Sequence, residues 1–543
     1  MWQLFGLPTL SDGLEMFCMR KSYCSLILLS LFPSLHGWSP SDAWPQWRGA
    51  ERNGRGLGQL ETKLNWSDSS PKLLWESPEL PSQDYGGFGS PVSDGRLVYL
   101  SIVWHRDEPS EERTVTSLVL RKLGARKINL PNDLVERVEK ERLNLSPRLR
   151  GSKLDEWIEQ WLSQNLDQKQ RMTQGSLLAS RFKQGKLAMP VDAIDRLFSI
   201  KDQVFPNQKA LDDWIGKQGF SPELAEKISQ GVPPTQRAAD DVVVALNLRN
   251  GDFVWKTALP GLPTGRTSSS TPCLAKNKIF AIGGKRIFCL GIEKGDLIWE
   301  TEIHQKGVAS SPLYHEGKIF ALIGGLQAYD AQSGDLLWEN KEVTGNAASP
   351  ILWKNAKSTL IVCNSKKTVV GVDPTSGETR WKGPGGGSST PVTHGDLLIV
   401  HGKPEEVGVI AYQAGQDKIT EIWRFPKLTR RADSSPLVYD GKVFLMGAGM
   451  RLCLDLESGE LLRKFPAKHD ISSPVLLNGQ ILTYEINGSF LQLLDAEPDR
   501  LNDGQKFKIG ALKCTSPSLL GSNLIIRHAN GLSCFDLRGP APR

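Results

Sequence analysis

The sequence predicts an all-β protein, an eight-bladed β-propeller with a helical insertion in blade one. Two observations lead to this fold. A short hairpin unit recurs along the 543 residues, with a small residue on one strand and a tryptophan on the other. A Ser-Pro or Thr-Pro pair stands ahead of the copies, at steps near 40 residues. A period of this length, with about four short strands per unit, is typical of propeller blades.

The hairpin unit is clearest at residues 326–338, which read LQAYDAQSGDLLW. In its turn, Asp and Ser can bond back to nearby backbone amides, and Gly334 can take a positive φ without steric cost. Ala328 lies on one arm of the expected hairpin and Trp338 on the other. The unit recurs at 245–255, 289–299, 371–381 and 453–463, where Arg463 stands in the tryptophan place, with looser copies at 411–423 and 491–507.

Eight Ser-Pro or Thr-Pro pairs are expected to begin the innermost strands. A residue before proline is held extended, and crowding near the propeller axis favours small side chains. From Pro272 to Pro517 the steps are 40, 38, 41, 45, 38 and 43 residues. This structural role accounts for the serines, and no Gly-x-Ser-x-Gly sequence points to a catalytic one. The pairs are Ser90-Pro91, Thr271-Pro272, Ser311-Pro312, Ser349-Pro350, Thr390-Pro391, Ser435-Pro436, Ser473-Pro474 and Ser516-Pro517.

Two incomplete repeats near the chain ends complement each other. Residues 71–75 match the last strand of a repeat but precede the first Ser-Pro pair, and the copy that begins at Cys534 lacks that strand. Pairing the two would complete the final blade and cover edges that an open sheet exposes. We expect an irregular lead-in over residues 44–70, and the closing strand with the start of blade one over residues 71–104.

A helical insertion interrupts blade one. Pro91 and Pro272 are 181 residues apart, about 140 more than one period. Residues 105–239 carry more charge and show helical spacing: the stretch KLDEWIEQWLSQ at 153–164 places its apolar residues on one face. The remainder of the propeller is expected over residues 240–538.

Residues 1–43 are interpreted as a signal peptide with an upstream extension. Arg20 and Lys21 precede an apolar run at 25–35, which is too short to span a bilayer. We expect cleavage after Ala43, export to the periplasm or cell envelope of a bacterium, and no membrane span after cleavage. The alternative is an apolar N-terminal helix that stays attached.

Cysteines occupy the small-residue place of the hairpin in three copies, at Cys289, Cys453 and Cys534. Free cysteine packs as a small hydrophobe, so packing is favoured over a disulfide framework. Pairing of Cys273 with Cys289, or of Cys514 with Cys534, stays open in an oxidising compartment.

Charge and histidine placement argue against several functions. The net charge of +6 is small for this length and no basic run is dense, so nucleic-acid binding is not expected. The eight histidines are scattered without a His-Glu-x-x-His sequence, so no metal site is expected. No catalytic residue is identified, and we expect a monomer.

Basic residues stand just ahead of several Ser/Thr-Pro pairs, where connections into the innermost strands should surround one mouth of the channel. Such a mouth could attract an anion or an acidic peptide. The favoured alternative is a set of solvated loop charges, offset by Asp433 and Asp470. The possible ligand-binding channel mouth consists of Arg266, Lys306, Arg430, Arg431, His469 and Lys513.

The pattern small-x-Asp-x-x-Ser/Thr-Gly-Glu/Asp-x-x-Trp resembles the tryptophan-docking repeat of pyrroloquinoline-quinone (PQQ) β-propellers. Ala328, Asp330, Gly334 and Trp338 carry it in full. That superfamily includes quinoprotein alcohol dehydrogenases and the β-propeller lipoprotein of the outer-membrane assembly machinery. The resemblance implies that each tryptophan docks between neighbouring blades, near the small residue of the motif. The structural docking positions are Trp75, Trp255, Trp299, Trp338, Trp381 and Trp423.

Two function classes follow from the resemblance. The first is a non-enzymatic exported scaffold that binds a protein or polymer of the cell envelope and needs no cofactor. The second is a PQQ-dependent alcohol or sugar dehydrogenase, which would hold PQQ with Ca²⁺. Members of that branch typically have adjacent cysteines beside the cofactor; this sequence has none, and it has no Cys-x-x-Cys-His haem motif. The scaffold is therefore the expected function.

The insertion is the largest departure from the repeat, and functional variation tends to lie in such segments. We expect it to form the recognition surface together with the channel mouth near Arg266 and Arg431. Its tryptophans Trp157, Trp161 and Trp214 would belong to that surface. The alternative is that they form the small core of the insertion itself.

Overall fold

The computed structural model describes residues 43–538 except 57–59, 61, 68–69, 81–85, 262–267, 306, 416, 427–431, 448, 468–471 and 503. Residues 1–42 of the expected signal segment therefore lie outside the described residues. Within the described ranges, no helix is both long and apolar enough to cross a membrane.

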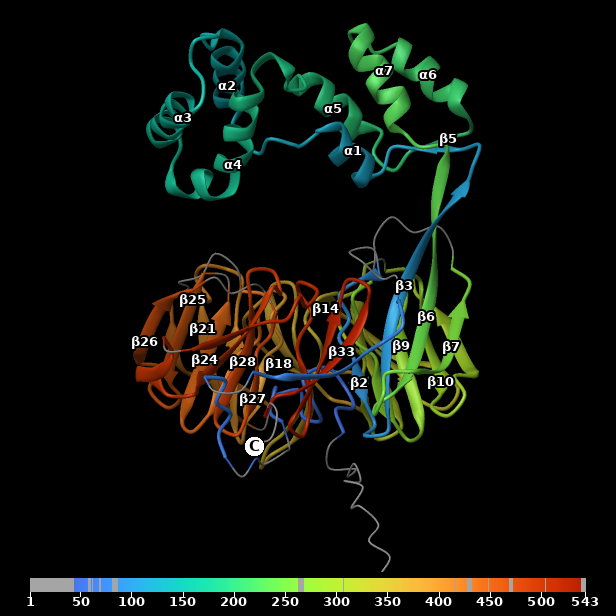
Figure 1. Ribbon diagram of the computed structural model, residues 1–543, viewed down its shortest axis with the longest axis vertical. Coiled ribbons are helices and arrows are strands. Elements are labelled where there is room, and N and C mark those ends of the chain that lie inside the picture. The colour runs from blue at the N-terminus through green and yellow to red at the C-terminus, as the bar shows by residue number, and fades with distance from the viewer. Residues whose placement is uncertain are drawn as a thin grey trace, which may run out of the picture. The chain divides into compact units, whose positions relative to one another are not determined.

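The described chain is mostly β, and its antiparallel sheets have the pattern of a β-propeller (Figure 1). Seven of these sheets have four strands and one, the third, has three. We number the sheets along the chain and order their strands from the inner strand, which follows a Ser/Thr-Pro pair, to the outer strand. Neighbouring sheets share apolar clusters; one contains Phe280 and Ile287 of the second sheet with Ile319 and Ala321 of the third.

The first sheet contains β2 (Val92–Ser93), β3 (Leu97–Pro109), β6 (Thr235–Asn247) and β7 (Phe253–Leu259); the second β8 (Cys273–Ala275), β9 (Lys278–Ile282), β10 (Arg286–Gly291) and β11 (Leu297–Glu302); the third β12 (Leu313–His315), β13 (Lys318–Asp330) and β14 (Leu336–Gly345); the fourth β15 (Ile351–Lys354), β16 (Thr359–Asn364), β17 (Thr368–Val372) and β18 (Thr379–Pro384). The fifth contains β19 (Val392–His394), β20 (Leu397–His401), β21 (Val409–Ala414) and β22 (Ile419–Phe425); the sixth β23 (Leu437–Tyr439), β24 (Lys442–Gly447), β25 (Met450–Asp455) and β26 (Leu461–Pro466); the seventh β27 (Val475–Leu477), β28 (Gln480–Glu485), β29 (Phe490–Asp495) and β30 (Gln505–Lys508); the eighth β31 (Ser518–Leu520), β32 (Asn523–His528), β33 (Gly531–Asp536) and β1 (Lys72–Glu76).

The outer strand of the eighth sheet comes from the opposite end of the chain. β1 pairs antiparallel with β33, with Lys72 opposite Asp536 and Trp75 opposite Cys534. This is the pairing that the two incomplete repeats predict. It leaves the last repeat with a full set of four strands.

A closed cycle of hydrogen bonds joins the inner ends of the eight sheets. The backbone N–H of each Ser or Thr that precedes proline donates to the hydroxyl of its counterpart in the next sheet, at 2.9–3.3 Å. The small hydroxyl residue is therefore needed as an acceptor as well as for its size. We call these residues the serine ring; in order they are Ser90, Thr271, Ser311, Ser349, Thr390, Ser435, Ser473 and Ser516, which bonds back to Ser90.

β3 and β6 are longer than the other strands of the first sheet and pair with each other from Leu97–Asn247 to Pro109–Thr235 (Figure 1). The helical region lies between them in the chain. Its elements are β4 (Arg113–Thr114), α1 (Ser117–Leu123), α2 (Asn132–Asn144), α3 (Ser152–Asn165), α4 (Gln168–Gln184), the 3-10 turn η3 (Gly185–Leu187), α5 (Val191–Ser199), β5 (Val204–Phe205), α6 (Gln208–Gly216) and α7 (Pro222–Gly231). Another 3-10 turn, η4 (Pro498–Arg500), precedes β30.

The helical region has two apolar cores of its own. In the first, Trp161 is buried and its ring meets Phe182 at 4.9 Å, with Trp157 at 5.1 Å on the same ring. In the second, Trp214 packs beside Phe205 and Phe220. The three tryptophans expected on a recognition surface therefore pack inside the helical region, which is the alternative that the sequence left open.

The described cysteines are all free thiols. Pairing of Cys273 with Cys289 or of Cys514 with Cys534 is therefore wrong for this structure. Cys289 is fully buried and lies directly opposite Trp299 in the sheet, as a small packing residue would. Cys453 and Cys534 take the same place opposite Arg463 and Trp75.

Candidate functional site

The repeat tryptophans lie at the joints between successive sheets. Trp75, on the outer strand of the eighth sheet, donates its Nε1–H to the carbonyl of Leu248 in the first sheet at 2.8 Å. The equivalent bonds run from Trp255 to Ile292 at 3.2 Å, from Trp299 to Ala331 at 3.3 Å and from Trp423 to Leu456 at 2.9 Å. Each of these indoles therefore ties its sheet to the turn of the next one.

The turn glycine of the next sheet makes room for the indole. Gly334 has a φ of +82°, and a Cβ atom there would lie 2.5 Å from the Trp299 ring. The motif spacing thus serves the turn and the neighbouring tryptophan together. In the same way Gly251, Gly295, Gly377 and Gly459 lie against Trp75, Trp255, Trp338 and Trp423.

Two of the six docking positions differ in detail. Trp338 packs on Gly377, but its Nε1 has no hydrogen-bond partner among the described residues. Trp381 packs over Gly371 of its own sheet and meets Trp353 edge-on, with 6.1 Å between ring centres. In the copy without tryptophan, Arg463 forms an ion pair across to Asp499.

A β-bulge directly precedes each tryptophan. Ala328 pairs with Trp338 and Tyr329 with Leu336, so Leu337 is an extra residue in the outer strand. An extra residue of this kind bends the strand and redirects its side chains. The bulge therefore allows two consecutive side chains to point outward while the tryptophan turns inward.

On four successive sheets these two outward positions are apolar. They are the eighth, first, second and third sheets, which follow one another around the serine ring. We call the eight side chains the apolar rim; they are 41–50% exposed and comprise Leu73, Leu74, Phe253, Val254, Leu297, Ile298, Leu336 and Leu337. Beyond the rim, the fourth sheet has Thr379 and Arg380 at these positions.

The lead-in carries two arginines to the inner strands. Arg48 donates from Nη2 to the carbonyls of Pro436 at 2.8 Å and Pro474 at 3.3 Å, in the sixth and seventh sheets. Arg52 donates to the carbonyls of Ser311 at 3.0 Å and Pro350 at 2.9 Å, and also to Pro312, in the third and fourth sheets. All these carbonyls belong to serine-ring residues or to the prolines directly after them. The fifth sheet separates the two pairs on one side and three sheets separate them on the other, so one lead-in segment joins distant parts of the serine ring.

Most of the predicted channel mouth cannot be placed. Arg266, Lys306, Arg430, Arg431 and His469 lie outside the described residues. The sixth residue, Lys513, is half-buried, and its Nζ lies 5.9 Å from the centre of the Phe88 ring. The mouth therefore stays a prediction.

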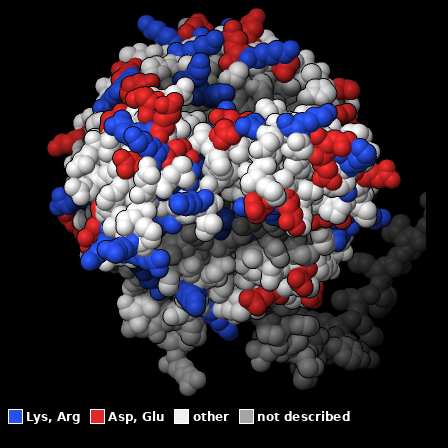
Figure 2. All heavy atoms as spheres, turned by 90° about the horizontal axis from the view of Figure 1, so that it is seen from above, with Lys and Arg blue, Asp and Glu red and all other residues white. Residues whose placement is uncertain are grey.

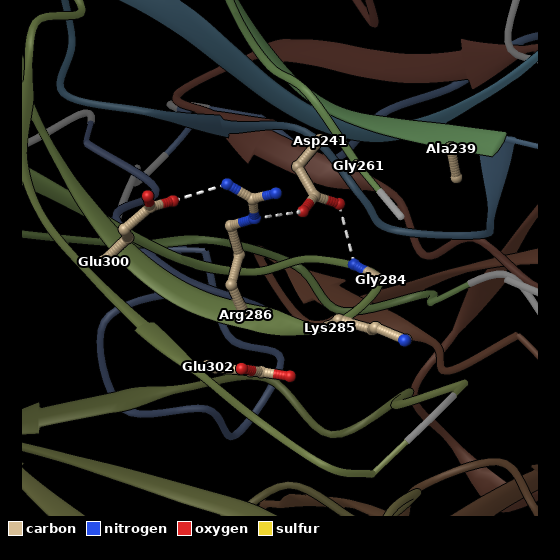
Figure 3. A pocket seen from close by; sticks show the side chains of 8 residues that line it. All are labelled: Ala239, Asp241, Gly261, Gly284, Lys285, Arg286, Glu300 and Glu302. Atoms are coloured by element: carbon tan, nitrogen blue, oxygen red, sulfur yellow. Dashed lines mark hydrogen bonds and ion pairs between the residues drawn. The ribbon is translucent and has the colours of Figure 1, made fainter. Parts of the chain in front are cut away.

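A pocket of about 310 Å³ lies between the first and second sheets (Figure 3). Its buried acid, Asp241 on β6, accepts a hydrogen bond from the Gly284 backbone N–H at 2.7 Å and pairs with Nε of Arg286 at 3.1 Å. Arg286, at the start of β10, also binds Glu300 and the carbonyl of Pro260. Figure 3 shows its guanidinium between the two carboxylates. The arrangement is a charged joint between neighbouring sheets.

The pKa values of the two adjacent acids of β6 are shifted in opposite directions. Burial raises the pKa of Asp241 to about 6, although the Gly284 N–H and Arg286 favour its charged form. The hydrogen bond from Arg106 lowers the pKa of neighbouring Asp240. Asp241 is 2% exposed, so its charged form depends on Arg286 and the Gly284 N–H rather than on water.

Sequence reasoning missed Arg48, Arg52 and Asp241. The two arginines stand four residues apart in a glycine-rich segment, a spacing that gives no indication of distant carbonyl acceptors. Asp241 begins the run DVVVAL, and an acid that opens a buried strand is a usable signal of a buried ion pair. Its partner in the next repeat could not be read from the sequence.

Charged side chains are mixed in sign over the face that Figure 2 shows. Lysines and arginines alternate there with aspartates and glutamates, without a broad area of one sign. A broad basic area of the kind that favours nucleic-acid binding is therefore not seen on this face.

A family model described as "Outer membrane protein assembly factor BamB" matches residues 239–419. The matched stretch runs from within β6 to the start of β22, the outer strand of the fifth sheet, and contains four of the six docking tryptophans. Residues 239–419, a third of the chain, therefore match the PQQ-like β-propeller repeat. None of the curated proteins matches this sequence.

Solved structures that align with this chain include BamB from Moraxella catarrhalis, with a TM-score of 0.44, 13% identity and coverage of 55% of this chain and 90% of that one. The computationally designed Ika8 protein aligns with a TM-score of 0.43 and 10% identity, over 55% of this chain and 93% of that one. Quinohemoprotein alcohol dehydrogenase from Comamonas testosteroni aligns with a TM-score of 0.41 and 11% identity, over 56% of this chain and 73% of that one.

Proposed function

We propose that this chain is an exported protein-binding scaffold of the bacterial cell envelope, in which eight PQQ-like blades form one ring and the helical region is inserted in the first blade. The apolar rim is the observation that carries the proposal. Exposed apolar patches on a protein surface mark interaction sites, and each sheet of the rim adds an adjacent pair of exposed apolar side chains. Here the bulge of each repeat holds them outward on four neighbouring outer strands.

The outer strands also offer backbone groups to a partner. The outer strand of a sheet has a row of N–H and C=O groups without strand partners, to which an extended segment of another protein can add. On β14, Leu336 and Leu337 lie at the start of such a strand. Main-chain pairing would supply affinity, and the apolar side chains would supply selectivity for an apolar partner segment.

A photo-crosslinking amino acid at Leu337 tests the proposal in cells. We expect it to capture one defined envelope protein, and we expect Leu336→Lys in the same protein to reduce the capture at least tenfold. The matched control is a crosslinker at Leu461, an exposed leucine on the outer strand of the sixth sheet, outside the rim. Equal crosslinking patterns at Leu337 and Leu461 would count against recognition by the rim.

The PQQ-dependent dehydrogenase is the competing function. Ca²⁺ prefers several oxygen ligands, mostly carboxylates and carbonyls. Among the described residues no three His, Cys, Asp or Glu side chains gather into a metal site. The described residues thus provide no carboxylate cluster that would favour this alternative, and we derive no reaction step through PQQ. Addition of PQQ and Ca²⁺, gel filtration and a dye-reduction assay with alcohols and sugars provide the check; stoichiometric retention with turnover would overturn the scaffold proposal.

A further inference from the structure

Positive charge is buried inside the serine ring without a negative partner. Arg48 is 1% exposed and Arg52 2% exposed. Their hydrogen bonds go to neutral backbone carbonyls and, for Arg52, to the side-chain oxygen of Gln46. Neither arginine takes part in an ion pair with any described carboxylate.

Both guanidinium groups stay charged at neutral pH. Burial lowers the pKa of Arg48 to about 9 and that of Arg52 to about 10. Both values lie well above 7, so the charge is not removed by loss of a proton. A charge that is taken out of water is tolerated when it is paired and hydrogen-bonded. The carbonyls supply hydrogen bonds here, but they supply no opposite charge.

Several buried donors, on Arg48 itself and at the inner strand ends, have no acceptor. Nε and Nη1 of Arg48 are buried and lack a hydrogen-bond partner among the described residues. The same holds for the hydroxyls of Ser270, Ser310 and Ser389, each of which directly precedes a member of the serine ring. Ser310 adjoins Ser311, whose carbonyl receives Arg52. The three hydroxyls belong to the second, third and fifth sheets, each one residue ahead of the serine ring.

We propose that the interior of the serine ring binds a small oxyanion, a carboxylate or a phosphate, against the open edge of Arg48. A guanidinium presents its N–H groups in a planar fork that matches the oxygens of such an anion. Serine hydroxyls rotate and can donate to a further oxygen. The anion would satisfy the orphaned donors and would neutralise charge that the chain itself leaves uncompensated. Arg48 of the lead-in would then bind the anion and the backbone carbonyls of the inner strands at the same time.

Thermal unfolding at constant ionic strength provides the first test. The protein is dialysed into chloride buffer, and inorganic phosphate or acetate then replaces part of the chloride. A ligand that binds only the folded state raises the Tm with its concentration. We expect a rise of about 2–4 °C at saturation with the preferred oxyanion, and the phosphate and acetate arms show which oxyanion the site prefers.

Arg48→Met should abolish this rise. The matched control is Arg55→Met, because Arg55 belongs to the same lead-in and donates to the carbonyl of Val438, but none of its nitrogen atoms is buried without a partner. The control should lower the starting Tm and keep the oxyanion-dependent rise. An equal rise in Arg48→Met and the parent would overturn the proposal, since the effect would then arise elsewhere on the surface.

A resident anion that survives dialysis is detected separately. If the Tm of the parent does not respond to added oxyanion, the site is already occupied. Acid denaturation should then release about one equivalent of oxyanion, which ion chromatography measures. If Arg48→Met does not fold, Arg48→Lys keeps the charge without the planar fork, and at least a tenfold weaker oxyanion response is expected. Absence of both a released oxyanion and an oxyanion-dependent Tm in the parent would leave only water in the ring and would disprove the proposal.

Discussion

A single pair of residues, one small and one large, sets the geometry of each repeat. Ala328 lies opposite Trp338, Cys289 opposite Trp299 and Gly371 opposite Trp381. The sequence predicted this pairing because the motif keeps a small residue ten positions before each tryptophan in the regular copies. It could not reveal that the motif glycine serves the tryptophan of the preceding sheet, since that contact joins two different repeats.

Replacing the turn glycine should therefore cost more than its backbone conformation alone. Gly334→Ala places a Cβ atom 2.5 Å from the Trp299 ring, whereas Gly317→Ala meets nothing within 4 Å at a similar φ, +76° against +82°. Both variants should lose about 1–2 kcal/mol from the left-handed backbone. Gly334→Ala should lose about 1–3 kcal/mol more of the free energy of unfolding, because the indole of Trp299 is displaced. Urea unfolding of the two variants measures the difference, and equal losses would contradict the docking role of the glycine.

The buried acid Asp241 should make stability depend on pH in an unusual direction. Its pKa is raised to about 6 from an ordinary value of 3.8, so the folded state binds the proton more tightly than the unfolded state. The stability that protonation provides is complete below about pH 3.8 and is lost as the pH rises through 6. The full effect is about 3 kcal/mol, and Asp241→Asn should remove this dependence.

Urea unfolding of the parent and Asp241→Asn between pH 4 and 7 is the measurement. The control is Asp240→Asn, because Arg106 lowers the pKa of Asp240 and its contribution should increase as the pH rises through the acidic range. If the parent and Asp241→Asn show parallel pH profiles, Asp241 is not protonated in the folded protein at these pH values.

At the scale of elements, the paired strands β3 and β6 connect the first sheet to the helical region. The sequence located the helical region from its charge and its helical spacing, and it placed a helix at 153–164, where α3 occurs. It could not show that the ribbon would continue to Pro109 and Thr235, since the residues involved are polar and lack strand alternation.

The apolar cores of the helical region draw on residues 115–232 and on none of the eight sheets.

Excision of the helical region should therefore leave the sheets folded. Trp104 and Asp240 lie opposite each other in the ribbon, so a short Gly-Ser turn can replace residues 105–239. We expect cooperative thermal unfolding with a Tm within about 5 °C of the parent, since few contacts of the sheets are removed. Circular dichroism and calorimetry report on this variant. Loss of the cooperative transition would show that the helical region supports the sheets.

At the scale of the whole molecule, the two ends of the repeat array meet in one sheet. The sequence predicted this from two incomplete repeats, because residues 71–75 match the strand that the last repeat lacks. It did not predict the serine ring as a hydrogen-bonded cycle, since Ser-Pro pairs some 40 residues apart carry no sign of bonding to one another. It also treated residues 44–70 as an irregular segment and missed the two arginines that reach four sheets.

Removal of β1 should open the eighth sheet. Deletion of residues 72–76 exposes the edge of β33 and removes Trp75, which is 6% exposed and bonded to the first sheet. We expect a loss of about 3–5 kcal/mol, as for a buried tryptophan truncated to alanine, together with concentration-dependent aggregation. The control is the double variant Leu73→Ser, Leu74→Ser, which keeps the backbone pairing and removes only exposed apolar groups. Light scattering distinguishes them, and a deletion variant as soluble as the control would argue against the closure.

The lead-in contacts have a consequence for the time at which the protein can finish folding. Arg48 and its acceptor at Pro474 are 426 residues apart in the chain. At ordinary rates of synthesis, roughly 20–90 s separate the production of these two residues. During that interval the earliest part of the lead-in has no acceptors, and the first outer strand has no β33 to pair with. Contacts of such long range slow folding, so the molecule is completed in a late step that brings its oldest and newest residues together.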